Sequence, residues 1–241
     1  MPRFFTDNID TAAGIGVITG ADASHIALSL RMRKGEQVTL CREGTDYICE
    51  LSDIAPESVT CRILSSEPCA AEPDIRLHLY QAVPKGEKAE IIVQKAVELG
   101  VYDITFMLTE RCISRPDDKS FSKKLSRYNR IALEASKQSG RGIVPAVYGM
   151  VSLAEAAGAC DGYDSTVWCY EKGGAKLGAL GLAPGTDIGL LIGSEGGFSE
   201  GEAEQLSAHG FTPATLGTRI MRCETAPLAA AAIIMYITGN I

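Results

Sequence analysis

Two glycine-rich segments of the sequence could bind a ligand, because glycine lets backbone groups approach a ligand closely. The first, Gly193–Phe198, follows the apolar stretch Asp187–Ile192 and leads into Ser199–Glu202. The serine and the glutamate three residues apart predict the capped start of a helix. A glycine-rich turn at the carboxyl end of a buried strand is where α/β sheets bind ligands. A tight strand-to-helix turn without a ligand would also account for this segment taken alone.

The second segment, Leu216–Ala226, carries Arg219 and Arg222 and precedes Pro227, a residue that the first turn of a helix tolerates. The helix that follows is apolar on all sides, so it should be buried. A partner subunit is one element that could supply some of that burial. Core packing explains this helix but not the arginines before it. Neither segment has the spacing of a P-loop or of a dinucleotide-binding turn, so nucleoside triphosphate hydrolysis is poorly supported.

A third signal is a polar stripe on a long helix expected over residues 121–139. Arg130, Glu134, Gln138 and Arg141 share one face if the helix persists to Arg141. Such side chains can hydrogen-bond the oxygens and the base edge of a nucleotide. An exposed network of charged side chains explains them as well. Residues 111–141 hold nine Lys/Arg against three Asp/Glu, which fits one cationic face on a body with a net charge of −7.

The elements that must position these residues fall into two groups. Short β segments separated by turns occupy the first 70 residues and suggest a small barrel or sandwich, over Ile15–Thr19, Gln37–Cys41, Tyr47–Ile54 and Val59–Leu64, with a short helix at His25–Arg31. A linker is expected at Ser65–Asp74. Beyond it, strands and helices alternate, which predicts an α/β domain with a largely parallel sheet over residues 73–241.

The bulk composition excludes several classes of protein. The chain has 241 residues, of which 46% are hydrophobic and 22% are charged, as in an ordinary globular protein. None of the eight cysteines forms a C-x-x-C pair, so we expect no metal site. The longest apolar run, Pro227–Ile237, is too short to span a bilayer, and we expect no signal peptide because no apolar stretch follows the first residues. We therefore expect a cytoplasmic protein with reduced thiols and no membrane partner.

Taken together, the segments resemble the bacterial 16S rRNA (uracil-N(3)) methyltransferases of the SPOUT superfamily. The resemblance covers essentially the whole chain in family order. It runs through M-P-R-F-F at the start, H-I-A-L-S-L-R-M-R-K-G-E, the stretches Pro84–Gly86, Gln94–Val101 and Glu134–Arg141, I-G-S-E-G-G-F-S, and L-G-T-R-I-M-R-C-E-T-A. The last two motifs are highly specific in combination.

The resemblance implies a PUA-like β-barrel over residues 1–70 and an α/β methyltransferase domain with a trefoil knot over residues 73–241. It also implies a homodimer that binds S-adenosyl-L-methionine (AdoMet) and acts on 16S rRNA of the small ribosomal subunit. The cofactor contacts implied in this sequence are Leu191, Gly193, Ser194, Glu195, Gly196, Gly197, Leu216, Gly217, Ile220, Met221, Arg222, Thr225 and Ala226.

Two positions depart from the family pattern. Ser194 stands where the family loop usually has proline, and serine frees the backbone torsion and restores an amide donor. We expect a less rigid loop with unchanged chemistry. Met221 replaces the usual leucine and preserves the size of the side chain.

For methyl transfer to N(3) of uridine, a proton must leave and the ring oxygens must take up charge. Arg222 and Arg141 are the candidates for stabilising that charge, and Glu134 and Gln138 for holding the base or relaying the proton. The expected RNA contacts are Arg3, Arg31, Arg33, Lys34, Lys85, Lys95, Arg111 and Arg115. Two alternatives stay open: a SPOUT enzyme that methylates a ribose oxygen of tRNA or rRNA, and a non-catalytic RNA-binding protein.

Overall fold

The computed structural model describes residues 1–241, and the chain divides into two compact units. The first unit consists of Met1–Glu72 and Ser136–Ile143, and the second of Pro73–Ala135 and Val144–Ile241. The sequence places the boundary near the same point but does not show that residues 136–143 belong to the first unit. Those residues come from the end of the long helix and the turn after it.

The first unit is built on one six-stranded sheet in the order β1-β4-β5-β6-β3-β2. Only β1 and β4 pair in parallel, and the other neighbours are antiparallel. The strands are β1 (Arg3–Phe5), β2 (Ile9–Asp10), β3 (Ile15–Thr19), β4 (Gln37–Arg42), β5 (Thr45–Ile54) and β6 (Ser58–Pro68). The four strands expected from the pattern of apolar residues are therefore all present, with β3 at the expected bounds.

A short helical segment covers the core of this unit. It begins as α1 (Gly20–Ser24) and continues as the π-helical turn η1 (His25–Ser29), so the helix expected at His25–Arg31 starts earlier and ends earlier. Ile26 is fully buried and packs with apolar residues of the sheet, among them Ile18, Val38 and Leu40. The sheet and this segment thus share one small hydrophobic core.

The prediction of a linker at Ser65–Asp74 is wrong for residues 65–68. Residues 65–68 extend β6, where Ser66 pairs with Tyr47 and Pro68 with Thr45. Proline is compatible with this position because it ends the strand, where a missing amide donor interrupts no ladder. The small and polar residues that suggested a linker are exposed residues of a long strand.

The second unit contains a seven-stranded sheet in which every neighbouring pair is parallel, in the order β11-β13-β10-β12-β7-β8-β9. Its strands are β7 (Arg76–Ala82), β8 (Asp103–Leu108), β9 (Ala146–Ser152), β10 (Ser165–Cys169), β11 (Ala175–Lys176), β12 (Asp187–Ile192) and β13 (Thr212–Thr215). This confirms the expected α/β class with a parallel sheet.

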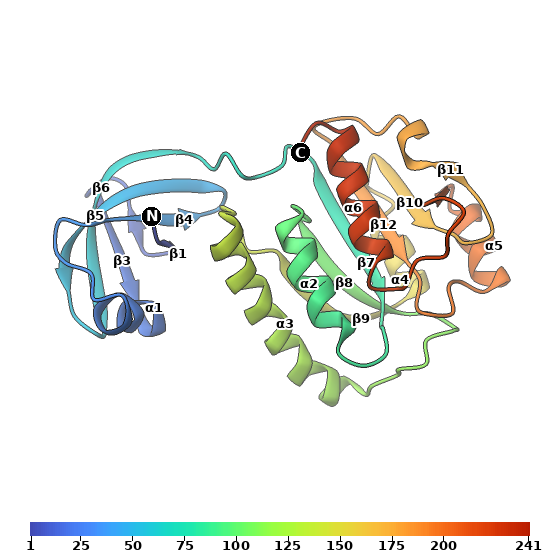
Figure 1. Ribbon diagram of the computed structural model, residues 1–241, viewed down its shortest axis with the longest axis horizontal. Coiled ribbons are helices and arrows are strands. Elements are labelled where there is room, and N and C mark those ends of the chain that lie inside the picture. The colour runs from blue at the N-terminus through green and yellow to red at the C-terminus, as the bar shows by residue number, and fades with distance from the viewer. The chain divides into compact units, whose positions relative to one another are not determined.

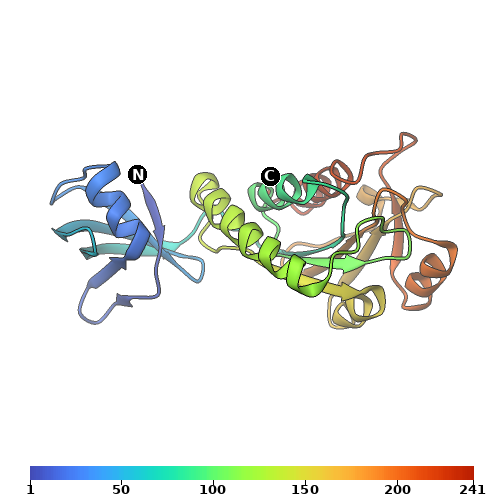
Figure 2. The same ribbon diagram turned by 90° about the horizontal axis from the view of Figure 1, so that it is seen from below.

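Helices cover both faces of that sheet. Figures 1 and 2 show α2 (Lys88–Glu98) and α6 (Ala226–Ile237) on one face, and α4 (Leu153–Ala159) and α5 (Glu200–Ala208) on the other. The remaining helices are α3 (Asp118–Ser139) and the short 3-10 turn η2 (Leu177–Ala179). The expected capping box at the start of α5 is confirmed, because Ser199 accepts from the amide of Glu202 and Glu202 reaches back to the amide of Ser199.

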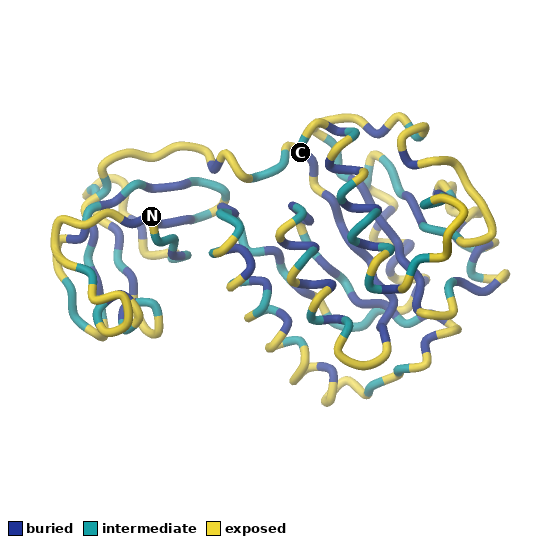
Figure 3. The backbone as a smooth tube through the Cα atoms, viewed as in Figure 1, coloured by how far each residue is buried: buried dark blue, intermediate teal, exposed yellow.

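The central strands of the parallel sheet are buried on both faces, as the dark segments of Figure 3 show. Three residues of β12 are fully buried: Ile188, Leu190 and Leu191. This burial explains the continuous apolar run in the sequence. Seven of the eight cysteines are buried, and all eight are free thiols. No helix is long and apolar enough to cross a membrane, and no three His, Cys, Asp or Glu side chains are grouped to hold a metal ion.

The end of α3 corrects one expectation from the sequence. Gly140 adopts a φ of +81°, and the amide of Arg141 donates to the carbonyl oxygen of Ser136 at 3.0 Å. This is the hydrogen bond of a Schellman motif, which ends a helix with a left-handed residue. The helix therefore stops before Arg141, which does not continue the stripe of Arg130, Glu134 and Gln138. Those three side chains are exposed, whereas Arg141 is buried.

Candidate functional site

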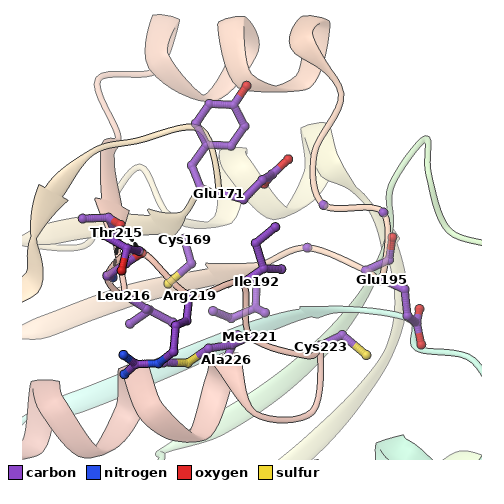
Figure 4. Close-up of a pocket in the computed structure, with 18 residues that line it drawn as sticks. Cys169, Glu171, Ile192, Glu195, Thr215, Leu216, Arg219, Met221, Cys223 and Ala226 are labelled. Carbon is purple, nitrogen blue, oxygen red and sulfur yellow. Dashed lines mark hydrogen bonds between the residues drawn. The ribbon is translucent and has the colours of Figure 1, made fainter.

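A pocket of about 280 Å³ opens at the carboxyl ends of three neighbouring parallel strands, β13, β10 and β12. Each strand contributes its last residue and the loop that follows, beginning at Thr215, Cys169 and Ile192. Figure 4 shows Glu171 and Arg219 on different sides of this pocket, and Glu195 together with Cys223 at one end. This is the edge at which an open α/β sheet binds ligands.

The two glycine-rich segments found in the sequence meet in this one pocket. Ten of the thirteen residues expected to bind cofactor line it: Gly193, Ser194, Glu195, Gly196, Gly197, Leu216, Gly217, Ile220, Met221 and Ala226. The other three do not. Leu191 is fully buried in β12, and Arg222 and Thr225 are exposed next to lining residues.

Three glycines of the first loop cannot be replaced without displacing atoms around them. A Cβ atom at Gly193 would lie 3.0 Å from the backbone of Gly197, and one at Gly196 would lie 2.9 Å from Cβ of Arg111. Gly197 has a φ of +65°, which L residues adopt only at a cost. The loop therefore folds back on itself, closed by a hydrogen bond from the amide of Gly197 to the carbonyl oxygen of Ser194 at 2.9 Å.

Glu195 anchors the tip of this loop to the segment before α2. Its Oε1 accepts from the amide of Lys85 at 3.0 Å and from Nζ of Lys88 at 3.0 Å. Burial raises the pKa of Glu195, but hydrogen bonds from backbone amides and from Lys88 outweigh that effect and lower the pKa to about 2. Glu195 is therefore an anion at neutral pH and holds its partners as a charged acceptor.

A third loop, after β10, completes the pocket and was missed from the sequence. Cys169, Tyr170 and Glu171 line it, and both carboxylate oxygens of Glu171 lie within 3.0 Å of where a Cβ atom on Gly197 would be. Arg111 connects the loop after β10 with the first glycine-rich loop. Its guanidinium donates to the carbonyl oxygen of Gly196 at 2.9 Å and lies 4.0 Å from the carboxylate of Glu171. The strand-like stretch Ser165–Cys169 was the available signal, but only the strand order places it beside β12.

The pocket offers both apolar and polar contacts to a ligand. Ile192, Leu216, Met221 and Ala226 provide apolar surface, while backbone groups of the glycine-rich loops provide hydrogen-bonding partners. Oγ of Ser194 is buried and has no hydrogen-bond partner within the protein. A buried hydroxyl without a partner is unfavourable, so a ligand or a water molecule in the pocket is the natural partner for it.

The four residues expected to act in catalysis occupy different environments. Arg222 is exposed between the lining residues Met221 and Cys223. Arg141 is 2% exposed in the first unit, where its Nε and Nη2 donate to the carboxylate of Glu72 at 2.9 and 2.8 Å. Glu134 lies in the part of α3 that belongs to the second unit, and Gln138 in the part that belongs to the first; both are exposed. The ion pair with Glu72 indicates that Arg141 stabilises the fold of the first unit.

Several residues expected to bind RNA have partners within the protein. Arg3 forms a two-point ion pair with Asp46 at 2.6 and 2.7 Å, and its side chain is 17% exposed. Four of these residues are exposed: Arg31, Arg33, Lys34 and Lys85. Lys34 forms an ion pair with Asp53, and Lys95 forms one with Glu98. Arg115 donates to the carbonyl oxygens of Thr109 and Glu110. Arg111 binds the first glycine-rich loop, as described above. RNA binding stays a prediction, based on the exposed side chains of Arg31, Arg33, Lys34 and Lys85.

Comparison with known proteins supports one family. The sequence model of an RNA methyltransferase domain matches residues 71–235, and that of an RNA methyltransferase PUA domain matches residues 18–64. The chain is 34% identical over 230 residues to ribosomal RNA small subunit methyltransferase E of Bacillus subtilis, covering 92% of this chain and 90% of that protein. The enzyme of the same name from Aquifex aeolicus is 29% identical over 206 residues, covering 85% and 87%.

Solved structures give the same result. A crystal structure of ribosomal RNA small subunit methyltransferase E from Neisseria gonorrhoeae, bound to S-adenosyl methionine, matches with a TM-score of 0.85 and 31% identity, covering 99% of this chain and 98% of that one. A methyltransferase structure from Legionella pneumophila in complex with the same cofactor has a TM-score of 0.85 and 30% identity, covering 97% and 96%. With its pocket at the carboxyl ends of β10, β12 and β13 and these full-length likenesses, the chain belongs to the RNA methyltransferase family that includes ribosomal RNA small subunit methyltransferase E.

Proposed function

We propose that this protein transfers a methyl group from AdoMet to N(3) of one uridine in 16S rRNA of the small ribosomal subunit. The observation that carries the proposal is the convergence of both glycine-rich segments on one pocket, at the carboxyl ends of neighbouring parallel strands. Relatives of similar length and fold are ribosomal RNA small subunit methyltransferases, and two solved structures carry the cofactor.

The residues of the pocket fit AdoMet. The missing side chains at Gly193, Gly196 and Gly197 leave backbone groups open to a ligand, and any Cβ atom there would crowd neighbouring atoms. The hydroxyl of Ser194 is available for one hydrogen bond. Apolar side chains such as Leu216 and Met221 suit the flat adenine ring, and the ionic ends of Glu171 and Arg219 suit a zwitterionic amino acid.

AdoMet, when bound, supplies a methyl group on a positively charged sulfur. The protein must orient the uridine and manage the proton of N(3) and the charge that develops on the ring oxygens. Arg222 is exposed beside the pocket, so its guanidinium can reach a base at the mouth and stabilise that charge. Glu134 and Gln138, exposed on α3, keep the roles proposed for them in holding the base or relaying the proton.

Three further features belong to the proposal. Exposed apolar side chains on α6, Ile233 and Tyr236, and Ile220 in the loop before it, support a homodimer, because such residues are costly to leave in water. The PUA-domain match supports RNA binding by the first unit. The family resemblance leads us to propose a closed barrel there, a trefoil knot around the two glycine-rich segments, and a cytoplasmic location.

The proposal is tested by methylating small ribosomal subunits from a strain that lacks the modification. The purified protein and AdoMet with labelled methyl groups are expected to yield 3-methyluridine at a single position, identified by mass spectrometry of the digested nucleosides. Free 16S rRNA in a parallel reaction tells whether the assembled particle is required. A product methylated on the ribose would overturn the N(3) assignment, and no incorporation with either substrate would overturn the activity itself.

A further inference from the structure

Lys88 joins the two glycine-rich loops although it does not line the pocket. It lies in the first turn of α2, and its Nζ is 3.0 Å from Oε1 of Glu195 and 3.1 Å from Oε2 of Glu224. Glu195 belongs to the loop after β12, and Glu224 to the loop before α6. One ammonium group thus bridges two segments that are separated by about 30 residues in the sequence and that both line the pocket.

The surroundings make this bridge more than a surface ion pair. The side chains of Lys88, Glu195 and Glu224 are 31%, 25% and 22% exposed, so water screens them only in part. The buried thiol of Cys223 lies 3.5 Å from Nζ of Lys88 and donates to Oε2 of Glu224 at 3.4 Å. Cys223 and Glu195 both line the pocket, so the bridge lies at the pocket wall.

The carboxylates of Glu195 and Glu224 can lie close together because the ammonium group of Lys88 sits between them. Burial raises the pKa of both Glu195 and Glu224, yet hydrogen bonds with backbone amides and with Lys88 lower each pKa below its usual value, so both are charged at neutral pH. Without the ammonium, two like charges would face each other in a partly desolvated place. Their repulsion would favour a wider separation of the two loops.

We propose that Lys88 is a positioning residue, which holds the two loops of the pocket at the separation that AdoMet requires and thereby sets the affinity for the cofactor. The inference rests on the proposed function for the identity of the ligand. The contacts themselves concern the free protein and can be tested without any ligand.

The first experiment compares the Lys88→Met and Lys88→Arg variants with the unmodified protein. Isothermal titration with AdoMet is expected to show an affinity lower by about tenfold for K88M, the equivalent of one charge-assisted hydrogen bond, and an affinity within about threefold of the unmodified protein for K88R. Arginine restores the positive charge and offers donors to both carboxylates. The matched control is Lys172→Met, which removes one exposed ion pair, with Glu200, and should leave the affinity unchanged.

The second experiment measures amide hydrogen exchange in the protein without cofactor. K88M should exchange faster than the unmodified protein in residues 193–198 and 216–226 together, while K172M should not. The double variant K88M/E224Q should regain part of the protection from exchange and part of the affinity for AdoMet, because only one of the two facing carboxylates, that of Glu195, stays charged. If K88M does not fold, Lys88→Gln, which removes the positive charge and leaves both carboxylates charged, gives the same comparison.

The inference is overturned if K88M binds AdoMet like the unmodified protein, if K88R loses as much affinity as K88M, or if exchange in the two loops does not change. A failure of the unmodified protein to bind AdoMet would instead count against the proposed function. In that case the exchange measurement would still decide whether Lys88 holds the loops.

Discussion

A Cβ atom at Gly197 would lie 2.7 Å from Oε2 of Glu171, so any side chain there would require the Glu171 carboxylate to move aside. The backbone of Gly197 adds a second constraint, with its φ of +65°. Replacing Gly197 by alanine is therefore expected to shift the loop and to weaken AdoMet binding by about tenfold or more, measured by calorimetry. The control is Gly201→Ala, in α5, where nothing lies within 4 Å of the new Cβ atom. Equal binding by G197A and G201A would show that this contact is not needed.

Substitution of Arg219 should affect cofactor binding, and substitution of Arg222 should affect catalysis. Both arginines are exposed, but only Arg219 lines the pocket. We expect Arg222→Ala to lower the methylation rate by about a hundredfold, as loss of a charge-stabilising group does, with AdoMet affinity nearly unchanged. Arg219→Ala should instead weaken AdoMet binding. Rates at saturating cofactor and calorimetric affinities for both variants check this, and a full rate for R222A would remove Arg222 from the mechanism.

The ion pair of Arg141 with Glu72 predicts an effect on stability. Oε1 of Glu72 also accepts from the amides of Gly142 and Ile143, so the pair secures the turn after α3. Arg141→Met would leave the carboxylate of Glu72 without its main partner and is expected to lower the free energy of unfolding by about 3 kcal/mol. Urea denaturation gives this value. If R141M keeps its stability but loses methylation, the role of Arg141 in charge stabilisation, expected from the sequence, would be supported instead.

The lowered pKa of Glu195 predicts a dependence on pH. A carboxyl group whose pKa falls from 4.5 in the unfolded chain to about 2 in the folded protein stabilises the fold fully above pH 4.5. That contribution is lost as the pH falls from about 5 toward 2. The difference in unfolding free energy between the unmodified protein and Glu195→Gln should therefore be largest near neutral pH and shrink below pH 4.5. A difference that stays constant down to pH 2 would show that the charge of Glu195 does not stabilise the loop.

The buried hydroxyl of Ser194 should matter only when the cofactor is bound. Because its Oγ has no partner in the protein, Ser194→Ala removes no hydrogen bond and should leave thermal unfolding of the free protein unchanged or slightly improved. AdoMet affinity is expected to fall by about fivefold if the cofactor is the partner of this hydroxyl. Unchanged affinity would assign the hydroxyl to a water molecule.

Local patterns in the sequence were enough to find most elements. The apolar run before Gly193 and the Ser199–Glu202 cap gave β12 and the start of α5, because a strand buried on both faces and a capped helix each leave a signal within a few residues. The convergence of the two glycine-rich segments could be expected only through the family resemblance.

The remaining features depend on contacts between distant residues. Glu171 joins the pocket because β10 lies beside β12. Lys88 contacts Glu195 and Glu224 because α2 begins next to both loops. Arg141 leaves the helical stripe because of a single glycine, Gly140, whose left-handed conformation can be suspected but not assigned from sequence. In each case the spacing along the chain carries no information about the partner.

The burial of the cysteines makes the protein suitable for site-specific labelling. Burial raises the pKa of the thiols of Cys49 to about 11 and of Cys160 and Cys169 to about 12, so little thiolate exists at neutral pH to react with a maleimide. One cysteine introduced at an exposed position, for example at Thr218 in the lining of the pocket, would then react before the native ones. A fluorophore attached there could report ligand binding in the pocket of an otherwise unmodified chain.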